Sequence, residues 1–208
     1  KETLDCLSIP KHKRLSSRIY RHIKATKLLT TDHPVVISGN ASKDIMRMPV
    51  WISQWLKDQF IKKKDLNKNQ NTTRIYIDRS LQNSTDSPQR LIENEDEVKK
   101  YLVSKNFVSV RLHDLEFMEQ VKLFNNAEFI VGLHGGGFAN LVFCKPGTKV
   151  LEMKSITSGD PIKNLSQINK LIYYAISASS KEIDKFKSPN QQGSIKIEID
   201  QLAKIIEN

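Results

Sequence analysis

The sequence predicts an α/β fold with a mostly parallel sheet and helices on both faces of that sheet. Two observations favour this class. Short apolar runs typical of buried strands alternate with amphipathic stretches at helical spacing over most of the 208 residues. Residues 129–153 have, in order, the pattern of a strand, a glycine turn, a short helix, a Pro-Gly turn and another strand, which is a βαβ-like unit. A chain of this length is sufficient for one sizeable domain, and no internal repeat is visible.

The N-terminal half contains apolar patterns of both periods. We expect a helix over residues 2–8, a strand within 19–29, a buried strand at 35–37, a helix over 48–60 and a strand at 75–77. Apolar side chains recur at helical spacing in the second helix, so Trp51 and Trp55 are interpreted as packing residues. The polar stretches 62–73 and 81–89 are predicted loops, and the second is a candidate lid over an anionic ligand because it lies between two arginines.

The C-terminal half alternates strands and helices more regularly. We expect helices over 95–104 and 115–124, a helix after a turn at 158–161, a closing helix over 201–207, strands at 108–112, 129–133, 149–153, 171–176 and 195–199, and a hydrophilic loop over 180–192. Asn94 is the predicted N-cap of the first helix, with Glu97 completing a capping box, and Asp200 is predicted to cap the last. Gln120 is expected to bond the backbone of a neighbouring loop in preference to touching a ligand.

The most informative stretch is residues 134–140, of sequence HGGGFAN, between a predicted strand and a short helix. Glycine allows backbone conformations closed to other residues and lets a ligand approach the main chain closely. The first turn of the following helix offers unpaired N–H groups at a positive dipole end. These features suit a phosphate or diphosphate group, although a glycine turn that only packs a helix against the sheet has the same pattern.

Two polar side chains lie at the carboxyl ends of neighbouring predicted strands. His134 follows the strand at 129–133 directly, and Glu152 lies near the end of the strand at 149–153. Ligands of open α/β sheets bind beyond the carboxyl ends of such strands. The sequence therefore predicts a ligand site at this edge of the sheet.

The chain is basic, with 33 Lys and Arg against 23 Asp and Glu and a formal net charge of +10. Such a balance favours anionic partners without choosing among them. The local concentrations of cations at residues 11–27 and 62–64 carry no recognised nucleic-acid motif, and aromatic residues are not interleaved with them. We therefore predict a solvated basic surface and no nucleic-acid partner, while peripheral contact with an anionic membrane stays open.

The sequence contains few signals for the cellular compartment or for the limits of the protein. Cys6 and Cys144 allow one disulfide, but their separation and the apolar context of Cys144 favour a reduced chain. No stretch is apolar enough over a sufficient length to span a membrane, and no signal peptide is visible. Because the chain begins with Lys and not Met, we expect that an upstream portion precedes it.

Several ordered elements of the chain resemble the family-61 glycosyltransferases. Residues 117–153 are similar to the family signature, in which a Gln-containing helix leads to a strand, a His-Gly-Ala-Gly turn, an Asn, a Pro-Gly turn and a strand carrying Glu. Residues 74–80 resemble the family's strand ending in Arg, and residues 90–97 its Arg-hydrophobic-Asn-Glu element. The resemblance covers roughly residues 35–155, with a weaker similarity before them. Gly136 stands where the family usually has Ala, which keeps the turn small.

The resemblance implies a Rossmann-like domain that forms the C-terminal half of a GT-B architecture. Residues 1–34 would then be a connecting segment at the end of an acceptor domain, and residues 35–208 the nucleotide-sugar-binding domain. It further implies transfer of a sugar from a nucleotide sugar, commonly a UDP-sugar, with inversion and without a metal or other cofactor. The acceptor would be a glycan, a lipid-linked molecule or a protein, as in polysaccharide biosynthesis.

The positively charged residues of the implied donor site are Arg79 and Arg90. Inverting transfer requires a base that takes the acceptor proton and positive groups that stabilise the departing diphosphate. Guanidinium groups suit the second role because they bind phosphate oxygens in bidentate fashion. The amides of Gly135, Gly136 and Gly137 would assist them.

The remaining implied donor-binding residues are Asn140, Glu152 and His134. Glu152 is a candidate acceptor of hydrogen bonds from ribose hydroxyls, and the alternative is an outward-facing polar residue of a strand. His134 is a candidate phosphate ligand and the tentative catalytic base, although a structural histidine satisfied by backbone competes with both roles. The base can also lie outside this chain, in the acceptor domain. For that reason the chain alone is expected to bind nucleotide and to turn over poorly.

Other functional classes fit the residues less well. His-Gly-Gly-Gly also occurs in the oxyanion loop of esterases, but the Gly-X-Ser-X-Gly nucleophile turn that this chemistry needs is missing. A non-enzymatic nucleotide- or polyanion-binding module remains as the alternative function. The predicted location is the cytoplasm for a bacterial protein, with membrane association open, and the secretory pathway for a eukaryotic one.

Overall fold

The computed structural model describes residues 2–30, 38, 44, 49–62, 73–79, 91–180 and 194–208. The predicted strand at 35–37, the predicted loop at 81–89, nearly all of the loops at 62–73 and 180–192, and Arg90 lie outside these residues.

A five-stranded sheet organises the part of the chain that the structure describes. Its strands are β1 (Thr73–Ile77), β2 (Phe107–Val110), β3 (Ala127–Leu133), β4 (Lys149–Ser155) and β5 (Ile172–Ala178). They run parallel in the order β2-β1-β3-β4-β5. All five were predicted, although β2 ends at Val110 because the chain enters the 3-10 helix η3 (Leu112–Asp114). The parallel sheet confirms the predicted α/β, Rossmann-like fold.

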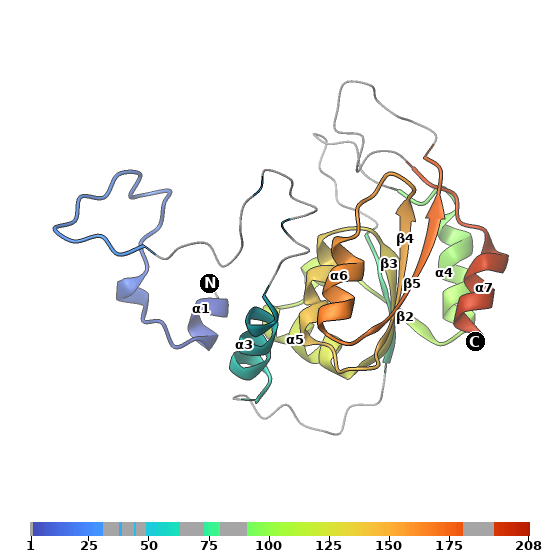
Figure 1. The fold of residues 1–208 in the computed structure, drawn as a ribbon, viewed down its shortest axis with the longest axis horizontal. Coiled ribbons are helices and arrows are strands. Elements are labelled where there is room, and N and C mark those ends of the chain that lie inside the picture. Colours follow the sequence, from blue (N-terminus) through green and yellow to red (C-terminus); the bar gives the residue numbers. More distant parts are fainter. Residues whose placement is uncertain are drawn as a thin grey trace.

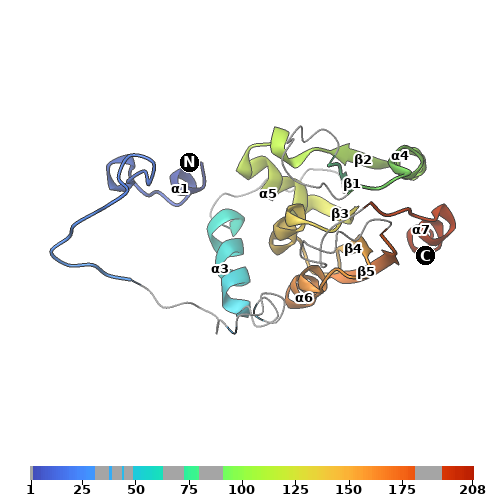
Figure 2. The ribbon, with the colours of Figure 1, turned by 90° about the horizontal axis from the view of Figure 1, so that it is seen from above.

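Helices cover both faces of the sheet, as predicted (Figure 1). One face carries α3 (Val50–Phe60), α5 (Phe117–Asn126), α6 (Pro161–Ile168) and the 3-10 helix η4 (Gly136–Phe143). The other carries α4 (Glu95–Ser104) and α7 (Ile199–Ile206). Figure 2 shows the sheet between these two helical layers. Parallel strands need such cover because both of their faces are apolar.

Each layer has its own apolar core. Beneath α3 and α5, the ring of Phe60 meets that of Phe117 edge to face, with centroids 4.9 Å apart. Beneath α4 and α7, Val98 and Leu202 are fully buried against the opposite face of the sheet. Burial of such side chains supplies the main stabilisation of the fold, roughly 1.5–3 kcal/mol for each large apolar residue.

The N-terminal segment projects away from the sheet (Figures 1 and 2). It contains α1 (Glu2–Cys6) and the 3-10 helix η1 (Lys11–Lys13). The Glu2 carboxylate accepts hydrogen bonds from the N–H groups of Phe117 (2.6 Å) and Met118 (3.1 Å). A side chain of α1 therefore provides acceptors for the first N–H groups of α5. The predicted strand within 19–29 is wrong, because this stretch pairs with no described strand and Ile19 and Leu28 remain exposed.

The two capping predictions have different outcomes. The predicted position is confirmed for Asn94, which is the N-cap residue of α4, but the predicted capping box is wrong. The Asn94 side chain makes no capping bond to the backbone of α4; its amide nitrogen donates to Oε2 of Glu97 at 3.0 Å and to the carbonyl of Ile197 at 2.8 Å, and its oxygen accepts from the Ile197 N–H at 3.0 Å. The prediction that Asp200 caps the last helix is wrong. The predicted strand at 195–199 forms only isolated bridges at Ile195, and α7 begins at Ile199 with Glu198 as its N-cap, so Asp200 lies inside the helix. The Asn94 side chain therefore anchors an extended segment instead of capping a helix.

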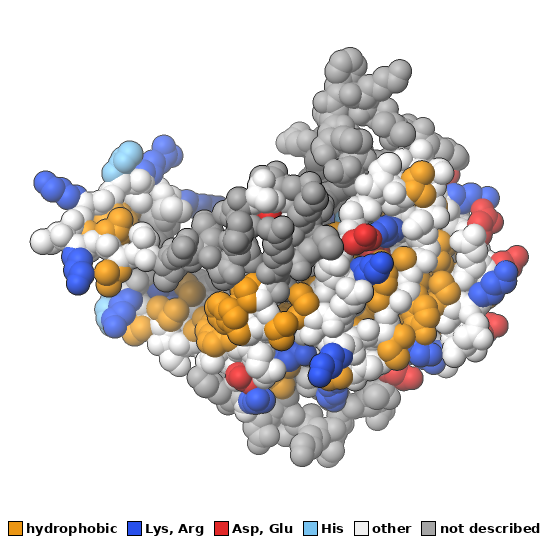
Figure 3. Space-filling model, in the orientation of Figure 1, with side chains coloured by type: hydrophobic (Ala, Val, Ile, Leu, Met, Phe, Trp, Pro, Cys, Tyr) orange, Lys and Arg blue, Asp and Glu red, His pale blue; other side chains and the backbone are white. Residues whose placement is uncertain are grey.

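The two tryptophans of α3 are not the packing residues that helical spacing suggested. The exposed fractions of Trp51 and Trp55 are 60% and 43%, and Val50 beside them is also exposed. The helix instead buries Ser53 and Phe60. Figure 3 shows hydrophobic side chains gathered on the surface over α3.

Candidate functional site

Several predicted site residues lie together at the carboxyl ends of the strands, at the point where the order of the strands reverses. Strand β2 lies on one side of β1, and the chain then continues on the other side with β3. The carboxyl ends of β1 and β3 therefore form a topological switch point, which is the usual ligand-binding position of open α/β sheets. Arg79 follows β1, His134 follows β3, and Glu152 lies in β4 beside them.

A cavity of about 210 Å³ opens at this switch point. Its lining residues come from the end of β1, from η3, and from the end of β3 with the start of η4: Ile77, Asp78, Arg79, Leu112, His113, Leu133, Gly136, Gly137 and Phe138. The carboxylate of Asp78 is paired with the ammonium of Lys99 at 3.0 Å, which offsets its negative charge. The Arg79 guanidinium therefore gives the cavity a positive character.

The glycine turn needs glycine because other side chains pack closely against it, and not because its backbone angles require glycine. Gly135 is extended (φ 165°, ψ −179°), and among the described glycines it is Gly147 that lies in the left-handed region (φ 85°). A Cβ at Gly135 would lie 2.8 Å from Nη1 of Arg79, and one at Gly137 would lie 3.0 Å from Cδ1 of Leu112. The prediction of special backbone conformations at these glycines is therefore wrong, whereas the side chains of Arg79 and Leu112 approach the turn too closely for a larger residue. The close approach of a ligand stays a prediction.

Gly136 differs from its two neighbours. A Cβ there would meet no heavy atom within 4 Å, so an alanine fits at this position without a clash. The N–H groups of Gly136 and Gly137 begin η4 and make no hydrogen bond with any other described residue. They are the orphan donors that the start of a helix presents to an anion.

Arg79 is held against the glycine turn. Its Nη1 donates to the carbonyl oxygen of His134 at 3.1 Å, and the N–H of His134 donates to the carbonyl of Met153 at 2.8 Å. These bonds connect the ends of β1, β3 and β4. The guanidinium is thereby placed beside Gly135 at the wall of the cavity.

A buried polar cluster lies behind the turn. Nδ1 of His134 hydrogen bonds Oε1 of Glu152, and the Tyr173 hydroxyl of β5 donates to Oε2 of the same carboxylate. Glu152 has no exposed surface, and His134 is 3% exposed. Burial, and then the bond to Glu152, raise the pKa of Tyr173, so its hydroxyl stays protonated and donates. Both carboxylate oxygens of Glu152 are therefore occupied from inside the protein, and it is not an outward-facing strand residue.

Lys154 continues the polar side of β4 beyond Glu152. Its Nζ donates to the carbonyl of Gly159 at 3.0 Å and to Oδ1 of Asp160 at 2.9 Å. The hydrogen bond from Lys154 holds the pKa of Asp160 below its ordinary value of 3.8. This pair fixes the turn that leads into α6.

Asn140 and Gln120 connect η4 with α5. The Asn140 amide donates to Oε1 of Gln120 at 3.0 Å, and Nε2 of Gln120 donates to the carbonyls of Leu112 (2.8 Å) and Leu115 (3.1 Å). The prediction that Gln120 binds a neighbouring loop is confirmed. Asn140 therefore supports the cavity wall that η3 provides.

The structure brings together Arg79, the glycine turn, His134 and Glu152, while Arg90 lies outside the described residues. Within the part of the chain that is described, no group of three or more His, Cys, Asp or Glu side chains is arranged to hold a metal ion. Tyr173 was missed by sequence reasoning, because the pattern of a strand does not reveal which of its residues faces a carboxylate on the next strand.

Comparison with known proteins adds one finding about the family. The family model described as Glycosyltransferase 61 matches residues 4–151, which include β1 to β3, the glycine turn and the start of β4. The match begins within α1 and therefore includes the projecting N-terminal segment. No curated protein matches the chain. None of the helices in the described part is long and apolar enough to cross a membrane.

Proposed function

This chain belongs to glycosyltransferase family 61, and from that premise we propose that it binds the nucleotide-sugar donor of an inverting glycosyl transfer. The donor is a UDP-sugar, and the chain forms the nucleotide-binding half of a GT-B enzyme. The observation that supports this best is the cavity at the switch point, which has an arginine and two orphan backbone N–H groups in its wall.

The diphosphate of the donor occupies this cavity. It accepts hydrogen bonds from the Arg79 guanidinium and from the amides of Gly136 and Gly137, while Gly135 gives the guanidinium room to approach. When the bond to the sugar breaks, negative charge develops on the departing phosphate oxygen. The same donors stabilise that charge, and because they are already in place they need little reorganisation. We assign Arg90 to the same role on the strength of the family resemblance.

His134 and Glu152 position the turn. Glu152 is fully buried and already accepts two hydrogen bonds, so a ribose would reach it only after its partners had moved. We therefore assign it to holding the His134 ring, with the Nδ1 proton directed at the carboxylate. Asn140 braces η4 in the same way. His134 is not among the residues that line the cavity, which favours a general base supplied by an acceptor domain.

The acceptor side is proposed from the N-terminal segment. Residues 15–29 carry the exposed apolar side chains Leu15, Ile19, Tyr20, Ile23, Leu28 and Leu29. Such a surface is typical of a contact with another domain or with a membrane. We propose that it connects to the acceptor domain of the GT-B enzyme. We expect poor turnover from residues 1–208 alone, and robust sugar transfer by this chain would contradict the assignment.

A lipid-linked acceptor in polysaccharide biosynthesis, at the surface of an anionic membrane, suits the charge of the same segment. No Asp or Glu occurs between Cys6 and Asp32, where the chain has Lys11, Lys13, Arg14, Arg18, Arg21, Lys24 and Lys27. Figure 3 shows Lys and Arg side chains around this projecting segment. Vesicles containing phosphatidylserine should bind the protein in a salt-dependent manner, and neutral vesicles should not.

A UDP titration followed by calorimetry tests the donor assignment. At raised salt, general attraction to polyanions is screened, so a nucleotide-sugar site should retain saturable binding that prefers UDP to ADP and GDP. A non-enzymatic polyanion-binding module should instead lose its affinity steeply with salt and show no preference for a base. That second result would replace the proposed function by its alternative.

A further inference from the structure

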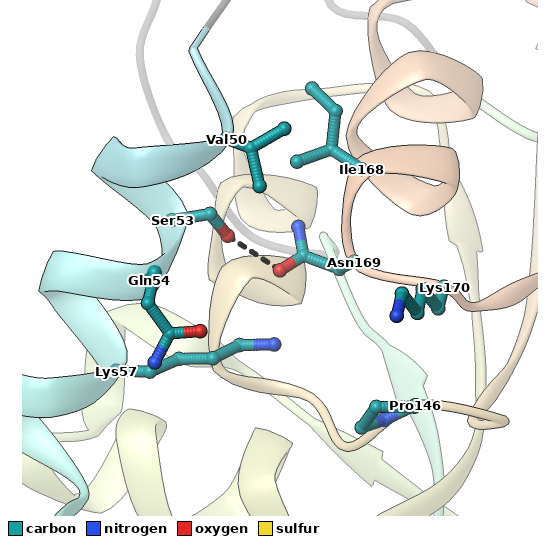
Figure 4. Close-up of a pocket in the computed structure, with 8 residues that line it drawn as sticks. All are labelled: Val50, Ser53, Gln54, Lys57, Pro146, Ile168, Asn169 and Lys170. Carbon is teal, nitrogen blue, oxygen red and sulfur yellow. Dashed lines mark hydrogen bonds between the residues drawn. The ribbon is translucent and has the colours of Figure 1, made fainter.

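A second cavity, of about 240 Å³, lies at the amino edge of the sheet, opposite the donor site. It is formed by α3, by the turn before β4 at Pro146, and by the end of α6 (Figure 4). It shares no lining residue with the switch-point cavity. Its position separates it from the transfer chemistry, which belongs to the carboxyl ends of the strands.

The floor of this cavity is polar and fixed. Ser53 and Asn169 are both buried, and the Ser53 hydroxyl donates to Oδ1 of Asn169 at 2.5 Å. Nδ2 of Asn169 donates to the carbonyl of Leu165 at 2.9 Å. The first bond joins α3 to the end of α6 and the second fixes the Asn169 side chain on α6, so the cavity is preformed between two rigid elements.

Two ammonium groups face the cavity from opposite sides. Figure 4 shows Nζ of Lys57 and Nζ of Lys170 turned toward the same hollow, with Gln54 next to Lys57 on α3. Neither lysine forms an ion pair with a described residue, and the described lining contains no carboxylate. Burial lowers the pKa of Lys57, which reflects the cost of holding its charge partly away from water. An anion in the cavity would offset that cost.

Lys170 also occupies a backbone position that favours another residue. It follows α6 with φ 57°, in the left-handed region where a helix commonly ends in Gly. The N–H of Leu171 donates to the carbonyl of Ser166 at 2.9 Å, which completes the helix end, and the Lys170 carbonyl accepts from Gly147 at 2.9 Å. A lysine at this position makes the protein less stable than a glycine would. What lysine adds here, compared with glycine, is its side chain.

We propose that this cavity is a second binding site, for an anionic ligand of monosaccharide size, namely a sugar that carries a phosphate or a carboxylate group. The volume corresponds to roughly eight water molecules in the liquid, which exceeds what a bare oxyanion needs. The lysines bind the anionic group. Nε2 of Gln54 already donates to Oδ1 of Asp58 at 2.9 Å, so Gln54 binds sugar hydroxyls through its amide oxygen. Val50, Pro146 and Ile168 offer apolar surface to the C–H face of a sugar ring.

Calorimetric titration of residues 1–208 with glucose 6-phosphate, glucuronate, glucose and inorganic phosphate tests this proposal. Glucose 6-phosphate or glucuronate should bind saturably, and comparison of the two separates a phosphate from a carboxylate ligand. Glucose and inorganic phosphate should each bind at least about 10-fold more weakly, because each lacks one part of the ligand. Binding should persist when UDP is present in excess. Competition by UDP, or equal binding of glucose, would overturn the proposal.

Two lysine variants distinguish a binding role from a structural one. Lys57→Gln and Lys170→Gly should each weaken the binding of the charged sugar at least about 10-fold, whereas Lys204→Gln on α7 should not change it. Lys170→Gly should at the same time raise the melting temperature, because glycine relieves the positive φ, so lost binding cannot be attributed to misfolding. The opposite outcome is altered stability with unchanged binding. It would mean that the lysines only satisfy the carboxyl ends of α3 and α6, and it would overturn the proposal.

Discussion

The two edges of the parallel sheet carry cavities of similar size and different chemistry. The cavity at the carboxyl edge, of about 210 Å³, has backbone N–H groups and one arginine in its wall and a buried His134–Glu152–Tyr173 cluster behind it. The cavity at the amino edge, of about 240 Å³, has two lysines and no carboxylate among its described lining residues. Both favour anions, but by different means.

The polarity of a parallel sheet explains this difference. Helices begin near the carboxyl ends of strands, where their first N–H groups are unpaired and carry positive partial charge. Helices end near the amino edge, where the unpaired groups are carbonyls. Positive charge at that edge must therefore come from side chains such as Lys57, which lies in the last turn of α3. An anion site built from backbone is thus expected at one edge only.

The two edges should differ most in the loss of stability that follows when one charged side chain is removed from each. Glu152→Ala leaves the buried His134 ring and the half-buried Tyr173 hydroxyl without their acceptor, and should lower the free energy of unfolding by about 3–5 kcal/mol. Lys57→Met removes a half-buried cation that has no ion-pair partner among the described residues, and should change stability by no more than about 0.5 kcal/mol. Chemical denaturation of both variants measures the contrast. Equal losses would show that the buried cluster is not the anchor of the carboxyl edge.

The next effect concerns binding at the carboxyl edge. Arg79→Ala should weaken UDP binding by about 1.5–3 kcal/mol, the usual contribution of a charged hydrogen bond, and should affect uridine much less. Arg111→Ala is the matched control, because Arg111 is paired with Asp114 and does not line the cavity. Calorimetry with both ligands gives the two losses. If UDP and uridine weaken equally, Arg79 has a structural role instead.

A smaller effect is expected from the hydroxyl that supports Glu152. Tyr173→Phe should cost about 1.5 kcal/mol of stability, because one buried oxygen of the carboxylate loses its donor. Tyr101→Phe provides the comparison, since the Tyr101 hydroxyl donates to the exposed carboxylate of Glu207 at 3.2 Å. That control should stay within about 0.5 kcal/mol of the parent. Similar melting temperatures for the two variants would remove Tyr173 from the cluster.

The smallest effect should be a dependence of stability on pH at the turn before α6. The folded-state pKa of Asp160 is lowered by its bond from Lys154, so this pair stabilises the protein fully above the ordinary pKa of 3.8 and loses its contribution as the pH falls through the lowered value. Because Asp160 is more than half exposed, the gain should stay below about 1 kcal/mol. Urea unfolding of Asp160→Asn should show a correspondingly weaker loss of stability in acid. An unchanged acid dependence would contradict this account.

Most of the fold was predictable because apolar periodicity reports burial directly. Prediction from periodicity failed where a segment is buried without pairing as a strand. Ile195 and Ile197 are buried with the alternation of a strand, but the segment packs on the second core with only isolated bridges. Conversely, Trp51 and Trp55 have helical spacing in a real helix and still face outward. The spacing defines an apolar stripe along the helix, but it does not define whether that stripe faces the core or the solvent.

The site was predictable where one short segment carries it. The glycine turn, His134 and Glu152 come from one βαβ-like unit, and Arg79 lies at the end of the strand next to β3. Tyr173 could not be found in this way. Its contact with Glu152 depends on the register between β4 and β5, which places Tyr173 opposite Val150, two residues away from the carboxylate it binds. The amino-edge cavity was missed because α3 and α6 are distant in sequence.

The central claim, that UDP binds on the glycine turn, is tested most directly by two substitutions at adjacent positions. Gly137→Val places its side chain against Leu112 and Ile77, whereas a Cβ at Gly136 meets no heavy atom within 4 Å. UDP binding measured by calorimetry should be lost in Gly137→Val and retained within about 0.5 kcal/mol in Gly136→Ala, which keeps the backbone amide and adds a single methyl group. Overpacking should cost Gly137→Val about 1–3 kcal/mol out of a total stability of about 5–15 kcal/mol, so melting should show a folded variant. Unchanged UDP affinity in folded Gly137→Val would mean that the ligand does not sit on this turn, and the assignment of the donor site would be withdrawn.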